Sequence, residues 1–366
     1  MLSKFFYWLK KSDWIVYVVT ILLVFFGLAV LYSISVNQEV PDLSRFYRQL
    51  SFAAAGVLLM LLFSSIDYRF FNSYRLILYL IGVVLLIAVL IFGQNIRGTT
   101  RWFGFLGQTF QPVELVKLFL IVFMSGYLAK YARHFYHFKH VLILGGWVFL
   151  SVLLVALEPK IGYAIIFILL WLIMMIVIRV RLLYLISIFL ILAVVASLSW
   201  FFILEDYQKD RLLTFIDPSR DPLGRGYNVT QSIIAVGSGK MLGRGLGLGS
   251  QSQLNFLPEQ ETDFIFAVIA EEMGFIGSFL IIILFVILLY RIWQITRVVR
   301  DNFALFFVLT TLILLFIQIF INIGMNIGLV PVTGIPLPFL SAGGSSLLVS
   351  LVTIGILQSI VARSKV

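Results

Sequence analysis

The sequence predicts an all-α integral membrane protein with about ten transmembrane helices and one long extracytoplasmic loop between the seventh and eighth spans. Of its 366 residues, 61% are hydrophobic and only 12% are charged. A soluble domain usually has about 25% charged residues, so most of this surface must face lipid. Apolar runs long enough to cross a hydrocarbon core of about 30 Å recur along the chain. Because lipid requires each backbone polar group to pair within its own segment, we expect these runs to be helices.

The predicted spans follow one another along the whole chain. They lie near 14–35, 49–65, 75–93, 113–130, 140–157, 161–178, 182–204, 263–290, 303–330 and 339–362. We expect residues 1–366 to form a single polytopic membrane domain. Three lysines precede the first run, as in a secretory signal, but the run exceeds the usual apolar core of about 7–15 residues and nine more runs follow it. We therefore predict that the first run is a retained helix.

The lysines and arginines are distributed unevenly between the two predicted sides of the membrane. With a cytoplasmic N-terminus, 15 of them fall in cytoplasmic segments and 5 in the short outside loops. This bias predicts that both termini are cytoplasmic. Topology and contact with anionic membrane lipid explain the net charge of +10, so we expect no nucleic-acid partner. The absence of cysteine excludes disulfides, thiol catalysis and thiolate metal ligands.

One predicted outside segment, residues 205–262, is much longer than the others. Loops of this length inside a compact protein are usually functional or disordered, and the apolar residues throughout this one argue against disorder. Residues 227–236 are predicted to form a short interfacial helix. The stretch "GSGK" at 237–240 lacks the glycine at 234 and the Ser or Thr at 241 that a nucleotide-binding loop needs, so nucleotide binding is not expected.

Three histidines, His134, His137 and His140, are spaced so that they would share one helix face. Such a face suits a metal ion. A polar interfacial loop beside Arg133 and Lys139 explains the same residues without a metal. We favour the second interpretation.

An ionisable side chain inside a membrane span is a functional candidate, because it costs several kcal/mol unless it is paired. Glu114 and Lys117 are three residues apart and therefore share one helix face. They form either a structural pair or the polar lining of a cavity. The preceding outside loop supplies Arg97, Arg101 and Trp102, a combination that suits an anionic lipid headgroup.

Carboxylates gather where the long loop meets the eighth span, in "FLPEQETDFIFAVIAEEMGF" at 256–275. Asp263 would be the N-cap of that helix, but capping does not explain the other four: Glu259, Glu261, Glu271 and Glu272. A helix over 263–290 would be about 42 Å long, so we expect its first turns, with Glu271 and Glu272, to lie near the membrane interface.

A carboxylate in a cavity that opens to the outside can act as a general base. Hydrolysis of an ordinary glycoside also needs a carboxyl acid to protonate the leaving oxygen. A sugar carried on a diphosphate needs no such acid once the charge of the diphosphate is neutralised. Asp263 with nearby cations therefore admits glycosyl transfer from a lipid diphosphate.

The motifs extend over the whole chain and are specific in combination. They are "RWFGFLGQTFQPVELVK" at 101–117, the pattern D-P-x-x-D-P-L-G-x-G-Y at 217–227, L-P-E-x-x-T-D-F at 257–264, and "NIGLVPVTGIPLPFLSAGGSSL" at 326–347. With these motifs the chain resembles the SEDS family (shape, elongation, division and sporulation). The second motif is more similar to the RodA branch of that family than to the FtsW branch.

The resemblance implies an inverting peptidoglycan glycosyltransferase of the bacterial inner membrane that acts in cell elongation. Its substrate would be lipid II, the undecaprenyl-diphosphate disaccharide-pentapeptide, polymerised at the outer face together with a class B penicillin-binding protein. Asp263 matches the family's essential aspartate and would be the catalytic base. The candidate substrate-binding residues are Arg48, Arg101, Glu114, Lys117, Gln251, Glu259, Ser341 and Ser345. A divalent cation, Mg²⁺ or Mn²⁺, would suit the diphosphate, although no ligand set in the sequence specifies it.

The chain departs from the family pattern at two places. Where the family usually has Q-P-D-L-G, the sequence reads "EPKIG", with Glu158 and Lys160. We therefore do not assign the family's acidic site residue to this position. Where the family usually has S-Y-G-G-S, the sequence reads "SAGGS", with Ala342. The remaining Ser341 and Ser345 have two interpretations, namely substrate contact and close helix packing by small residues.

Two other functions remain open at the level of sequence. A flippase that moves lipid II between leaflets needs polar residues along a path across the whole membrane. A scaffold that only activates its penicillin-binding partner needs no base at all. The charged residues of the spans lie toward the outer side, which favours chemistry at that surface.

Overall fold

The computed structural model describes residues 11–36, 42–96, 99–105, 108–135, 137–158, 161–202, 209–210, 213–215, 217, 225–253, 256–257 and 259–364. Within these ranges, nine helices are long and apolar enough to cross a bilayer, and a tenth is slightly shorter. The ten helices are α2 Trp14–Val36, α3 Ser44–Ser65, α5 Arg75–Phe92, α6 Pro112–Tyr131, α7 Phe138–Leu157, α8 Ile161–Val177, α9 Leu182–Phe202, α13 Ile265–Val298, α14 Asn302–Asn326 and α15 Gly344–Ser364. Each predicted span corresponds to one of them, which confirms the predicted class.

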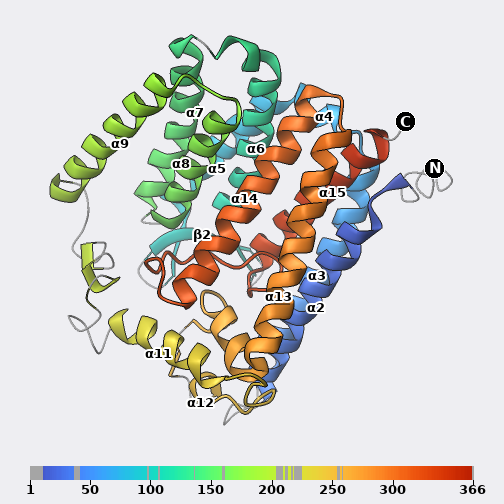
Figure 1. Cartoon of the computed structure of the whole chain (residues 1–366), viewed down its shortest axis with the longest axis vertical. Coiled ribbons are helices and arrows are strands. Elements are labelled where there is room, and N and C mark those ends of the chain that lie inside the picture. The colour runs from blue at the N-terminus through green and yellow to red at the C-terminus, as the bar shows by residue number, and fades with distance from the viewer. Residues whose placement is uncertain are drawn as a thin grey trace.

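The two described chain ends lie at the same end of the helical bundle (Figure 1). The short helix α4 Arg69–Ser73 lies at that end, whereas α11 Arg225–Ser238 and α12 Ser250–Gln253 lie at the opposite end. An ion pair and a hydrogen bond between distant segments stabilise this arrangement. Asp13 pairs with Arg291 at 2.6 Å, and the backbone N–H of Asp13 donates to Gln358 Oε1 at 2.9 Å. These bonds join the start of α2 to the ends of α13 and α15.

Helices α6 and α15 form the interior of the bundle: 78% and 89% of their most apolar stretches are buried. Helix α15 packs along α3, and α6 packs against α5 and α14. Small residues allow the close approach of α3 and α15, because a Cβ added to Gly355 would lie 2.5 Å from the carbonyl oxygen of Met60. The exposed side chains of these helices would face lipid. Apolar residues therefore form both the core and the outer surface of the bundle.

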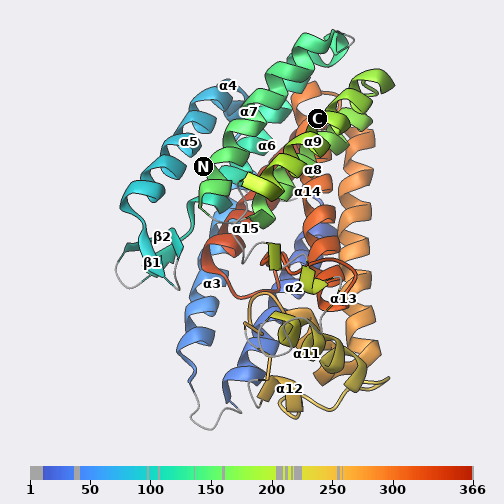
Figure 2. The same ribbon diagram turned by 90° about the vertical axis from the view of Figure 1, so that its left-hand side faces the viewer.

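A small antiparallel sheet interrupts the all-helical pattern between α5 and α6 (Figure 2). Its strands are β1 Gln94–Ile96, β2 Thr99–Phe105 and β3 Gln108–Phe110, with Gln94 opposite Trp102 and Phe103 opposite Phe110. The sequence predicts only an outside loop for this stretch. Threonine and aromatic residues favour paired strands, and a ladder satisfies the backbone polar groups outside the helices.

The eighth span differs from the prediction of a continuous helix over 263–290. Helix α13 begins at Ile265, continues to Val298 and is broken at Gly274, which has φ 66°. Residues 240–245 enter the break and take over the missing helical hydrogen bonds. The replacement bonds are Arg244 N–H to Glu271 O at 3.0 Å, Gly245 N–H to Glu272 O at 3.0 Å, Phe275 N–H to Lys240 O at 2.8 Å and Ile276 N–H to Met241 O at 3.2 Å. The long loop and α13 are therefore one interlocked unit.

This interlock predicts that Gly239→Ala lowers the melting temperature of the protein in detergent. A Cβ at Gly239 would overlap the carbonyl oxygen of Ala270, so the 240–245 segment would have to move out of the break. Overpacking of this kind costs about 1–3 kcal/mol. Gly237→Ala is the matched control, because nothing lies within 4 Å of its added Cβ. Equal melting temperatures for the two variants would contradict the interlock.

Candidate active site

Asp263 ends a tight turn that begins at Glu259 and leads into α13. Its backbone N–H donates to Glu259 O at 3.1 Å, and Glu259 has a left-handed φ of 54°. The N-cap position belongs to Phe264, so Asp263 stands one residue before the position that the sequence analysis assigned to it. The N-cap of α13 is therefore Phe264 and not the predicted Asp263.

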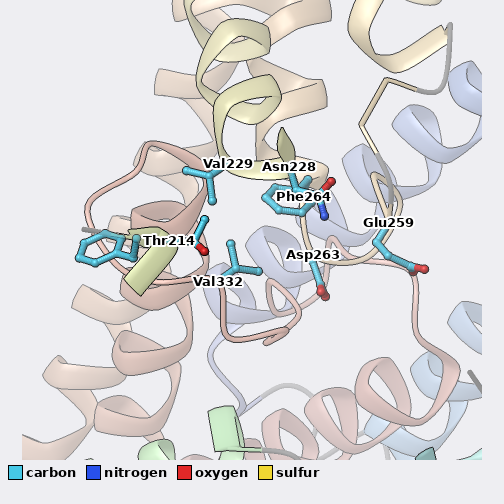
Figure 3. A pocket seen from close by; sticks show the side chains of 8 residues that line it. Thr214, Asn228, Val229, Glu259, Asp263, Phe264 and Val332 are labelled. Atoms are coloured by element: carbon cyan, nitrogen blue, oxygen red, sulfur yellow. The ribbon is translucent and has the colours of Figure 1, made fainter. Parts of the chain in front are cut away.

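A cavity of about 170 Å³ opens beside this turn (Figure 3). Asp263 and Glu259 line it from the turn, with the Glu259 carboxylate pointing away from the other labelled side chains, and α11 contributes a second wall (Figure 3). The lining residues are Thr214, Phe215, Asn228, Val229, Glu259, Asp263, Phe264 and Val332. Asp263 is half-buried and Glu259 is exposed. The cavity thus combines two carboxylates and one amide with apolar and aromatic walls, which is a common composition for a small-molecule site.

Glu114 and Lys117 form a buried ion pair in α6, with 2.7 Å between Lys117 Nζ and Glu114 Oε2. Tyr163 of α8 donates its hydroxyl to the other oxygen of Glu114. This geometry confirms that the two residues share one helix face and pair with each other. Their predicted contact with substrate stays a prediction.

The Glu114 cluster lies close to Asp263 through one loop, residues 331–343. Gly162, next to Tyr163, packs against Thr333 of this loop. The neighbouring Gly334 faces Asp263, since a Cβ added to it would lie 3.4 Å from Asp263 Oδ2. The loop therefore contacts both the start of α8, next to Tyr163, and the Asp263 carboxylate.

The two predicted serines make hydrogen bonds inside the protein. Ser341 Oγ donates to Thr262 O at 2.5 Å and accepts from Leu337 N–H at 2.8 Å. Ser345 Oγ accepts from the N–H of Gln111 at 3.1 Å. Neither is among the described residues that line the Asp263 cavity. Of the two interpretations left open, these bonds favour the structural one.

The remaining predicted substrate-binding residues lie on different elements. Arg48 is exposed near the start of α3. Gln251 lies in α12, where its backbone N–H donates to Glu271 Oε1 at 2.8 Å. Arg101 lies in β2, but its side chain is outside the described part of the structure. Arg97 and Lys160 also lie outside the described residues. The described residues around Asp263 include neither Arg48 nor Gln251.

Glu271 and Glu272 lie inside the protein, and their expected place near the membrane interface stays a prediction. Both are buried, at 0% and 1% exposure. Glu271 accepts from the backbone N–H groups of Gln251 and Ser252 at the start of α12, at 2.8 and 3.0 Å. Glu272 accepts from Ser33 Oγ of α2 at 2.9 Å. The two carboxylates hold the long loop against α2 and α13.

Glu261, the next acidic residue of the turn, pairs with Arg45 of α3 at 2.9 Å. Its backbone oxygen accepts from Ala342 N–H at 2.8 Å. The turn is therefore tied to α3 and to the 331–343 loop. The acidic cluster thus divides into structural carboxylates, Glu261, Glu271 and Glu272, and the two residues that line the cavity.

The three histidines lie around the turn between α6 and α7. His140 Nδ1 lies 3.1 Å from the hydroxyl oxygen of Tyr127, and its ring stacks on Tyr131. Over the described residues, no group of three or more His, Cys, Asp or Glu side chains is placed to hold a metal ion. A magnesium-like ion usually takes only one or two carboxylates together with phosphate oxygens. The carboxylates of the Asp263 cavity fit that donor set.

Several residues of the site are not among those predicted from the sequence. Asn228 and Thr214 line the cavity, and Asn322 and Asn326 of α14 bind the backbone of Asp263. The two asparagines of α14 had a usable signal, because polar side chains four residues apart inside an apolar span are functional candidates. The cavity residues gave none, since they come from the long loop, whose path the sequence does not define.

The fold and the site define a polytopic membrane protein with a carboxylate-lined cavity at the end of the bundle remote from the described chain ends. The family model for the FtsW, RodA and SpoVE proteins, described as "Cell cycle protein", matches residues 13–366. The chain therefore belongs to the SEDS family, as its motifs indicated.

Two relatives and two solved structures illustrate the similarity. The chain is 34% identical over 326 residues to the peptidoglycan glycosyltransferase MrdB of Escherichia coli K12, covering 88% of this chain and 87% of the relative. It is 34% identical over 366 residues to the stage V sporulation protein E of Bacillus subtilis, covering 97% and 99%. A chain from a peptidoglycan synthase complex matches with a TM-score of 0.81 at 27% identity, covering 96% and 98%. RodA of Thermus thermophilus matches with a TM-score of 0.70 at 24% identity and 96% coverage of both chains, which shows the shared fold.

Proposed function

We infer that this chain is a peptidoglycan glycosyltransferase that polymerises lipid II, with Asp263 as the general base. The observation that carries the inference is the position of Asp263 in the lining of the cavity. Membership of the SEDS family and similarity to a relative named peptidoglycan glycosyltransferase support the reaction class. The protein resides in the bacterial inner membrane as a multi-pass protein.

The chemistry follows from the substrate. The Asp263 carboxylate accepts the proton of the acceptor sugar's hydroxyl group, and the hydroxyl oxygen attacks the anomeric carbon of the donor sugar. The bond from that carbon to the undecaprenyl diphosphate breaks, and the diphosphate leaves with the bonding electrons. Because attack and departure occur on opposite faces of the carbon, the configuration inverts. One carboxylate is sufficient, because the diphosphate needs no carboxyl acid to leave.

The leaving diphosphate requires positive charge near the cavity. A divalent cation, Mg²⁺ or Mn²⁺, would supply that charge when bound, and Glu259 is the cavity carboxylate that would hold it. Arg48 and Arg101 remain candidates for contact with the substrate near the outer interface. A polar cluster next to the 331–343 loop would support the part of the site that binds the lipid headgroup. Its members are Glu114, Lys117 and Tyr163.

The orientation of the protein follows from its charge distribution. The end of the bundle that holds α4 and the described chain ends has the segments rich in lysine and arginine, so we place it in the cytoplasm. The Asp263 cavity then faces the outside, where lipid II is polymerised. A class B penicillin-binding protein is the proposed partner, and the similarity to a chain of a peptidoglycan synthase complex supports this assignment.

One reconstitution experiment distinguishes the polymerase from the flippase and the scaffold. The full chain, with its penicillin-binding partner, is placed in vesicles that contain lipid II and either Mg²⁺ or Mn²⁺. Glycan polymer and transfer of lipid II between leaflets are then measured in the same vesicles. We expect polymer that requires this chain. Transfer without polymer would instead identify a flippase, and polymer formed at the parent's rate by Asp263→Asn with its partner would identify a scaffold, which needs no base.

A further inference from the structure

Two asparagines lie on one face of the apolar helix α14. Asn322 and Asn326 are four residues apart, and both are fully buried. An unpaired amide in such a place costs about 1–3 kcal/mol in proteins. Buried amides of this kind therefore need hydrogen bonds that compensate for the loss of water.

Both side chains donate to the same acceptor, the backbone carbonyl oxygen of Asp263. The distances from that oxygen are 3.1 Å to Asn322 Nδ2 and 3.0 Å to Asn326 Nδ2. Further bonds orient each amide. Asn322 Nδ2 also donates to Ile335 O at 2.8 Å, and Asn326 Oδ1 accepts from Ala267 N–H at 3.0 Å. The carbonyl of Asp263 is thus held by two amides that are themselves fixed.

The same two residues connect other walls of the cavity. Ile335 belongs to the 331–343 loop, which faces the Asp263 carboxylate. Ser232 of α11 donates its hydroxyl to the backbone oxygen of Asn326 at 2.8 Å, and α11 lines the cavity. The base, the loop and α11 are therefore all held by one short stretch of α14.

We propose that Asn322 and Asn326 are positioning residues for the transfer reaction. They fix the backbone of Asp263 so that its carboxylate remains within reach of the acceptor hydroxyl. The inference rests on the proposed function and extends it to residues that lie outside the cavity lining. A displacement of about 1 Å in a reacting group can lower a rate by about 10²-fold, so loss of one amide should be visible in turnover.

The test uses the full chain with its partner and compares Asn322→Ala, Asn326→Ala and Asn326→Asp with the parent. Asn326→Asp keeps the size and the acceptor for Ala267 N–H but replaces the donor to Asp263. Gln318→Ala is the matched control. Gln318 is buried two turns before Asn326 in the same helix, and its amide nitrogen has no hydrogen-bond partner among the described residues. For each protein, the melting temperature and the kcat and KM of lipid II polymerisation are measured.

We expect each asparagine variant to lower kcat by about 10- to 100-fold while KM for lipid II stays unchanged, because only the base is displaced. Gln318→Ala should keep the parent's kcat although it also loses buried volume. If Asn326→Ala fails to fold, Asn322→Ala and Asn326→Asp decide the question.

Two results would overturn the inference alone. Asn variants with the parent's kcat would show that Asp263 needs no such support. An equal loss in Gln318→Ala would show that any damage to α14 has the same effect. Failure of the proposed function is seen separately: a parent protein that makes no polymer, or an Asp263→Asn variant that polymerises at the parent's rate, overturns both proposals.

Discussion

Replacement of Asp263 by asparagine is expected to lower the rate of glycan polymer formation by about 10²- to 10⁴-fold, the usual contribution of general acid–base catalysis. Asparagine keeps the shape of the side chain and its ability to accept hydrogen bonds, but it does not take the proton from the acceptor hydroxyl. The Asp263 backbone donates to Glu259 O and accepts from the amides of Asn322 and Asn326, and these bonds do not involve the carboxylate. The rate is measured with purified protein, its partner and lipid II.

Folding and partner binding are the controls for this variant. The melting temperature of Asp263→Asn should equal that of the parent within experimental error. The variant should still bind its partner. A folded, partner-bound variant with the parent's rate would show that the carboxylate has no chemical role.

Lys117→Met should cause the largest loss of stability among the variants considered. It leaves the Glu114 carboxylate buried in α6 without its cation, at 1% exposure. Removing one partner of a buried ion pair typically costs about 3–5 kcal/mol. We expect a large fall in melting temperature in detergent, or a failure to fold.

The double variant Glu114→Gln/Lys117→Met is the informative comparison. Replacing both partners removes the uncompensated charge, and such replacements are often close to neutral. The double variant should therefore be more stable than Lys117→Met alone. If the single variant is as stable as the parent, the pair does not hold α6 together, and its role as a fixed support behind the cavity is wrong.

The helical frame was predictable from the sequence because a bilayer imposes the same requirement on every span. About twenty apolar residues are needed to cross it, and lipid allows no unpaired backbone groups. All ten predicted runs correspond to helices for this reason, including α6, where Glu114 and Lys117 neutralise each other. The charge bias predicts the side of the membrane on which the cavity opens, and this orientation stays a prediction.

The details near Asp263 depend on contacts between distant parts of the chain, and periodicity carries no information about these. The break at Gly274 exists because residues 240–245 supply the hydrogen bonds that the helix loses there. The same segment helps to bury Glu271 and Glu272, and the sequence carries no signal for this burial. The β-strands at 94–110 were missed because short strands between long helices give a weak pattern.

The candidate site was predicted in part. The motif match identified Asp263 and Glu259, and the structure brings both to one cavity. Ser341, Ser345, Arg48 and Gln251 are not among its described lining residues, and the two serines bond to Thr262 O and to the N–H of Gln111 instead. Asn228 joins the site through tertiary contacts that the sequence does not reveal, whereas Asn322 and Asn326 were detectable as polar residues inside an apolar span.

The most direct test of the central claim is the rate of polymer formation by Asp263→Ala with added formate. The variant enlarges a cavity of about 170 Å³, and formate is small enough to enter it and supply the missing carboxylate. We predict that formate restores part of the rate in a saturable manner and that formamide, a neutral molecule of similar size, does not. A variant that polymerises at the parent's rate without any additive, or that formamide restores as well as formate, would contradict the assignment of Asp263 as the base.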